Sequence, residues 1–144
     1  MTDYVFKFMF DFLSFFFQIF LPFASFGFLL LLVGALLFVY VTRYREMELI
    51  AKGNVSVAIV FGGKLIGLSL VLAGAIANSV GLLDMLIWGA IGISAQILFF
   101  FAAEWVTPRF RIQESLENDN KAVALFLFFI SLSIGLLIAA CMTY

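Results

Sequence analysis

The chain has 144 residues, of which 65% are hydrophobic and 12% are charged, and its formal net charge is −1. Soluble domains have about half apolar and a quarter charged residues, so this composition excludes an ordinary water-soluble fold and indicates lipid as the solvent. The charge also argues against nucleic acid as a partner, because duplex binding depends on clustered Lys and Arg.

The chain has no histidine and a single cysteine, Cys141, which excludes several kinds of catalytic and metal site. An intrachain disulfide is impossible, and the usual catalytic triads and the commonest zinc sites require histidine. We therefore expect a protein that is not an enzyme, without catalytic residues, metal or cofactor. Cys141 is expected to be a small packing residue, with a redox or acylation role as the alternative.

Residues 1–22 form a Phe-rich segment in which Lys7, Asp11, Ser14 and Gln18 recur at helical spacing. This pattern predicts an amphipathic helix that lies in the membrane interface with its Phe side chains in lipid. Pro22 is expected to mark the junction with the first span. The alternatives are an N-terminal extension of that span and a fifth crossing.

Four apolar stretches follow, at residues 23–41, 55–77, 86–106 and 122–143. Each has about the 20 residues that a helix needs to cross the hydrocarbon core. Lipid offers no partner for backbone polar groups, so these spans must be helical. The sequence thus predicts an all-α membrane protein with four transmembrane helices.

Basic residues set the expected orientation, because they gather in two of the three loops: Arg43, Arg45 and Lys52, then Arg109, Arg111 and Lys121. Short loops rich in Lys and Arg stay in the cytoplasm. We therefore expect both basic loops to be cytoplasmic and both termini to be periplasmic or exterior.

The chain resembles itself at an offset of 66 residues. Arg43-Tyr44-Arg45 aligns with Arg109-Phe110-Arg111, Glu48 with Glu114, and Asn54 with Asn120. The offset predicts two parallel tandem helical hairpins, at residues 23–79 and 80–144, rather than the inverted repeats of many transporters.

The repeated loop residues form one candidate site. The asparagines suit the N-caps of the following spans, and the arginines suit membrane anchors. The alternative is a cytoplasmic site for an anionic lipid headgroup or a protein partner. Its candidate residues are Arg43, Arg45, Glu48, Asn54, Arg109, Arg111, Glu114 and Asn120.

Polar side chains inside the spans form a second candidate site, composed of Lys64, Gln96 and Glu104. Intramembrane charges usually face protein or water and find partners. Because helical side chains lean toward the N-terminus of their own helix, Lys64 and Glu104 should reach toward each other as an ion pair. The alternatives are a polar path for ions or protons and simple snorkelling of Lys64.

Small residues at helical spacing predict close helix packing. Two stripes carry them: Gly63, Gly67 and Gly74 in the second span, and Ser131, Gly135 and Ala139 in the fourth. Packing within one chain and self-association between chains both remain open.

Several stretches carry a family resemblance: Glu48-Leu49-Ile50 running into Asn54, Asp84 to Trp88-Gly89 with Gln96, Asn120-Lys121-Ala122, and the ending at residues 139–144. From about Val41 onward the chain resembles bacterial inner-membrane proteins called domain of unknown function 350. The resemblance implies four spans as a two-fold repeat in a bacterial cytoplasmic membrane and an accessory role beside envelope-stress or peptide-ligase neighbours. It implies no activity.

These observations predict a non-enzymatic structural, envelope-stress or sensing component of a bacterial inner membrane. We expect it to contact membrane lipids, to form a homo-oligomer and to offer a face to a cytoplasmic protein partner. A small oligomeric ion channel and a membrane subunit of an enzyme complex are the alternatives.

Overall fold

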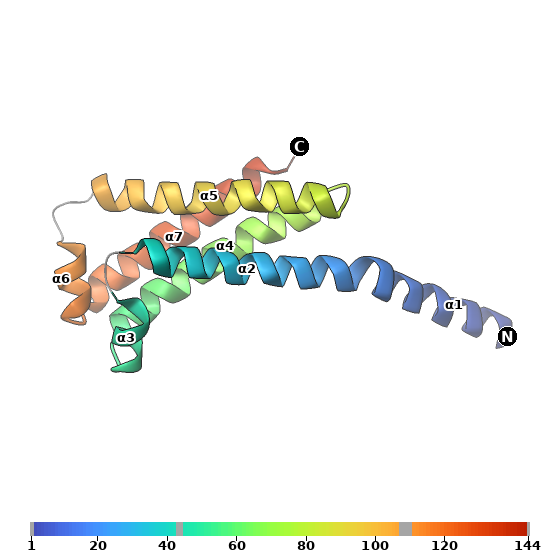
Figure 1. Cartoon of the computed structure of the whole chain (residues 1–144), viewed down its shortest axis with the longest axis horizontal. Helices are drawn as coiled ribbons and strands as arrows, with labels where there is room; N and C mark the ends of the chain where they lie inside the picture. Colours follow the sequence, from blue (N-terminus) through green and yellow to red (C-terminus); the bar gives the residue numbers. More distant parts are fainter. Residues whose placement is uncertain (1, 43–44, 107–110, 144) are drawn as a thin grey trace.

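The computed structural model describes residues 2–42, 45–106 and 111–143, and the elements in these ranges are all helical (Figure 1). Four helical stretches are long and apolar enough to cross a membrane: Asp3–Val41, Val55–Asn78, Leu82–Val106 and Lys121–Cys141. The predicted all-α membrane fold with four spanning helices is confirmed.

The elements follow one another along the chain with short connections. They are α1 (Thr2–Phe15), the π-helical turn η1 (Phe16–Phe20), α2 (Leu21–Val41), α3 (Glu46–Ala51), α4 (Val55–Asn78), α5 (Leu82–Val106), α6 (Ile112–Glu117) and α7 (Lys121–Cys141). The short helices α3 and α6 lie in the loops that the sequence marked as basic. α6 begins 66 residues after α3, and α7 begins 66 residues after α4.

The first span differs from the expected arrangement, because the helix runs through Pro22 without a break. Pro22 lies in the first turn of α2, where a missing N–H is tolerated. The turn before it widens, so that the Leu21 N–H donates to the Phe16 carbonyl oxygen five residues earlier. The structure therefore joins residues 2–20 to α2 as one continuous helix.

The α1 helix extends away from the bundle, past the end at which α4 and α5 are joined (Figure 1). Its apolar side chains are largely exposed, with Tyr4 at 82% and Phe8 at 74%. On the polar stripe, the Gln18 side-chain amide donates to the Ser14 hydroxyl at 3.0 Å. We call residues 2–20 the α1 arm.

The centre of the bundle is the crossing of α4 and α7, which the small residues of both helices allow. A Cβ atom added to Gly135 would lie 2.7 Å from the Cα atom of Gly67. Gly63 abuts the backbone of Phe128, and Gly74 abuts Ala139. The small-residue stripes of α4 and α7 therefore pack against each other within one chain.

The helices α2 and α5 flank this crossing and complete the core. Phe38 from α2 and Phe100 from α5 pack edge to face, with ring centroids 5.6 Å apart, and both are fully buried. Leu68 and Leu127 join them in the largest cluster of buried apolar side chains. This cluster surrounds the charged group described next.

Candidate functional site

Lys64 on α4 has a fully buried side chain within the cluster. Its Nζ atom donates to Glu46 Oε1 at 2.5 Å and to Thr42 Oγ1 at 3.0 Å. The rings of Phe38 and Phe100 lie beside the ammonium, with centroids 5.3 and 4.7 Å from Nζ. A cation in lipid needs such partners, because an unpaired charge inside a membrane is costly.

The ion pair joins three parts of the chain. Thr42 caps the C-terminal end of α2, Glu46 begins α3, and Lys64 lies on α4. The Glu46 side chain is also completely buried, and its second oxygen, Oε2, has no hydrogen-bond partner among the residues that the structure describes. Lys64 therefore holds both ends of the connection between α2 and α3.

Gln96 lies on α5 in a separate contact. Its side-chain amide donates to the Ser131 carbonyl oxygen at 3.0 Å and lies 3.3 Å from the Ser131 hydroxyl. Glu104, on the same helix as Gln96, is half-buried. The predicted cluster of Lys64, Gln96 and Glu104 is thus divided between a Lys64 centre and a bond from α5 to α7.

Sequence reasoning missed Glu46 and Thr42 as partners of Lys64. A signal was present at the 66-residue offset, where Glu46 corresponds to Ile112 and Lys64 to Ile130. Both charges are replaced by isoleucine in the second repeat. The joint change indicates that these two positions belong to one contact.

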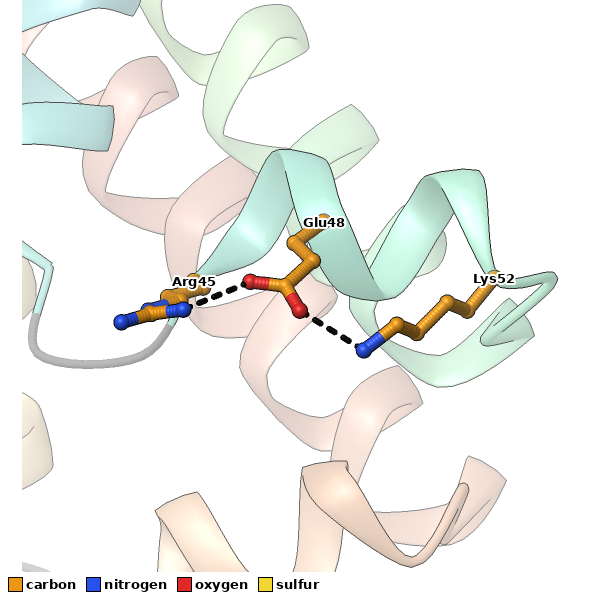
Figure 2. A network of polar contacts seen from close by, with 3 residues as sticks. All are labelled: Arg45, Glu48 and Lys52. Atoms are coloured by element: carbon orange, nitrogen blue, oxygen red, sulfur yellow. Dashed lines mark hydrogen bonds and ion pairs between the residues drawn. The ribbon is translucent and has the colours of Figure 1, made fainter.

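The repeated arginines engage nearby acids on their own helices. Arg45 contacts Glu48 at 3.1 Å and Lys52 contacts it at 2.7 Å. Figure 2 shows the Glu48 carboxylate between these two basic side chains. In the second repeat Arg111 contacts Glu114 at 3.3 Å. Arg43 and Arg109 lie outside the described residues. The hydrogen bond from Lys52, together with Arg45, keeps the pKa of Glu48 below its ordinary value.

Asn54 and Asn120 cap the helices that follow them. Asn54 Oδ1 accepts from the Val57 N–H, and Asn120 Oδ1 accepts from the N–H groups of Ala122 and Val123. Asn54 also donates to the Leu116 carbonyl oxygen at 2.7 Å, which ties α4 to the end of α6. These bonds give both asparagines a structural role.

Asp119 makes the reciprocal tie, because its Oδ1 atom accepts from the Ser56 N–H of α4 at 2.7 Å. It adopts the left-handed region with φ of 55°, which short polar side chains tolerate. The hydrogen bond to Ser56 holds the pKa of Asp119 below its ordinary value. These hydrogen bonds therefore tie the start of α4 to the α6–α7 connection at this end of the bundle.

The described ranges hold no group of three His, Cys, Asp or Glu side chains that could bind a metal ion. Cys141 is exposed near the end of α7.

Comparisons with known proteins agree with this description. The sequence profile described as Domain of Unknown Function (DUF350) matches residues 10–142. The chain is 40% identical over 103 residues to the UPF0719 transmembrane protein YshE of Bacillus subtilis, covering 72% of this chain and 77% of the relative. It is 33% identical over 110 residues to the UPF0719 inner membrane protein YjfL of Escherichia coli, covering 75% and 82%. No solved structure matches the chain significantly.

Proposed function

The chain belongs to the Domain of Unknown Function (DUF350) family, and from this premise we propose that it is a non-enzymatic structural component of a bacterial inner membrane that works as a homo-oligomer. It is an integral membrane protein, as its spans and the names of its relatives agree. The inner membrane is proposed because one relative carries that location in its name.

The closure of the bundle around Lys64 carries the proposal. The ammonium is already bound to Glu46 and Thr42 and covered by two aromatic rings. A conducting path or a catalytic proton carrier needs access to water or to a substrate, and the buried pair offers neither. This arrangement favours a structural component over an ion channel or an enzyme.

A homo-oligomer is supported by the small interior of the chain. Among the spans that the structure describes, half of the α4 span is buried, compared with 33% of α5, 28% of α7 and 17% of the first span. Close helix packing is the main attraction between helices in lipid, so the remaining apolar faces are suited to further helices or to lipid. The basic side chains near Glu48 and Glu114 already form ion pairs with these acids, so a binding site for a lipid headgroup or a protein partner is less favoured there.

Two measurements test the proposal. The mass of the protein extracted from native membranes into polymer-bounded lipid discs should be a multiple of the chain mass of 16.1 kDa. Reconstituted liposomes should show ion and proton flux at the background level. Monomers alone would remove the homo-oligomer, and flux that depends on the protein would favour a channel. A stable second protein at fixed ratio in the discs would favour the subunit of a larger complex.

A further inference from the structure

We infer that the groove between α5 and α7 is the docking site for α2 of a second copy of this chain. The inference rests on the proposed homo-oligomer and adds the surfaces that meet. The groove has a volume of about 510 Å³. The wall that α7 contributes consists of Phe126, Phe129, Ile130, Ser133, Ile134 and Leu137.

The same face exists in the first repeat, where it is covered. Subtracting the 66-residue offset converts the α7 wall into six positions on α4, each of which is buried: Val60, Gly63, Lys64, Gly67, Leu68 and Val71. On α7 the corresponding six side chains are exposed or half-buried. One chain thus contains two versions of this face, one filled and one open.

The helix α5 covers part of the face on α4. Gly92 of α5 lies against Val71, and Gln96 of α5 lies against Gly67. The 66-residue offset makes α2 equivalent to α5 and α4 equivalent to α7. Because α5 packs on this face of α4, the helix expected on the same face of α7 is α2, supplied by another copy.

The chemistry of the open groove suits an apolar helix. The charged Lys64 of the filled face is replaced by Ile130, and Gly63 is replaced by Phe129. The outer face of α2 offers exposed Phe26, Leu29 and Val33. Between helices in lipid, the packing of such surfaces is stabilising without any charged contact.

The offset also gives the register of the contact. Val71 corresponds to Leu137, and Gly92 corresponds to Phe26, so the contact between Val71 and Gly92 predicts one between Leu137 and Phe26 of the next copy. Both side chains are accessible in the single chain, at 67% and 37% exposure. Such a contact joins different surfaces and therefore builds a ring or a row of chains.

Cysteine cross-linking tests this register in native membranes. In a Cys141→Ser background, Phe26→Cys and Leu137→Cys are placed in separate chains with different tags and expressed together. Mild oxidation should join the two tags, and neither variant alone should dimerise. A chain with both substitutions should form a ladder or a closed ring of cross-linked chains. Leu136→Cys paired with Phe26→Cys is the matched control, since Leu136 is exposed but is turned about 100° away from Leu137 on α7.

The outcomes separate this inference from the proposed homo-oligomer. Oligomers in lipid discs without a specific link between positions 26 and 137 would overturn the docking site and leave the homo-oligomer in place. Equal linking of the Leu136 control, or homodimers of one variant, would overturn it as well. A monomer in lipid discs would remove both, with lipid filling the groove.

Discussion

Lys64 on α4 and Glu46 on α3 form an ion pair whose two side chains are completely buried, although 18 residues separate them in sequence. In the second repeat the two equivalent residues, Ile112 and Ile130, are both aliphatic. Both charges of the pair are therefore absent at the positions that the 66-residue offset makes equivalent.

The pair should behave as a unit when it is mutated. Lys64→Ile takes the ammonium away from the buried Glu46 carboxylate, and Glu46→Ile removes the carboxylate that the Lys64 ammonium contacts at 2.5 Å. We expect either change to destabilise the fold by about 3–5 kcal/mol. The double variant copies the second repeat and should recover most of the loss. Denaturant unfolding in mixed micelles measures the three free energies. Single variants as stable as the double variant would contradict the pairing.

The α4–α7 crossing should tolerate no added volume. A Cβ atom at position 135 would lie 2.6 Å from the Gly67 carbonyl oxygen, so Gly135→Ala should lower the free energy of unfolding by about 1–3 kcal/mol. Gly62→Ala is the matched control on α4, because nothing lies within 4 Å of its added Cβ atom. The same unfolding assay should find the control close to wild type, and an equal loss in both would refute close packing as the cause.

Acid should weaken the tie between the repeats. The folded pKa of Asp119 lies below its ordinary value of 3.8, so the hydrogen bond to Ser56 stabilises the fold above that pH. The contribution is lost as the pH falls through the folded pKa. The difference in melting temperature between wild type and Asp119→Ala should therefore shrink when the pH is lowered from 7 to 3. A difference independent of pH would show that the carboxylate charge plays no part.

The α1 arm should lie at the membrane surface opposite α3 and α6. The whole helix from Asp3 to Val41 has 39 residues and would be about 58 Å long if straight, while the hydrocarbon core is about 30 Å thick. Its exposed Phe side chains need lipid, so we expect the arm to bend at η1 and Pro22. The polar positions at 3, 7, 11, 14 and 18 fall within an arc of about 80°, which faces water in this arrangement.

Spin labels measure the depth of the arm. A label at Phe12 should contact quenchers at the level of the glycerol backbone, whereas a label at Ser14 should contact water-soluble reagents. A label at Leu36 on α2 is the control for a position within the span. Equal depth for Phe12 and Leu36 would indicate a fifth crossing, and full water exposure of Phe12 would contradict surface binding.

The sequence was sufficient for the spans, because length and hydropathy determine which segments cross a bilayer. It also predicted that Lys64 leans toward the start of α4, where Glu46 lies. It did not identify Glu46 as the partner, because a position in a basic loop does not by itself indicate that the side chain enters the bundle. Gln96 was grouped with Lys64 by depth alone, whereas its direction around α5 brings it to Ser131.

The helix through Pro22 shows another limit. Proline is usually read as a boundary, because it removes a donor and restricts the preceding residue. Here the wider π turn places the Leu21 N–H on Phe16, and the chain continues as helix. That adjustment depends on backbone geometry, which residue types alone do not specify.

The order of Glu46 and Lys64 along the chain matters for biogenesis. During synthesis the carboxylate leaves the ribosome 18 residues before the ammonium does. When the translocon releases α4 sideways into the bilayer, the counter-ion for Lys64 has already been made. The Lys64 ammonium, whose charge would oppose insertion of α4 into lipid, can thus enter the membrane already paired with the Glu46 carboxylate.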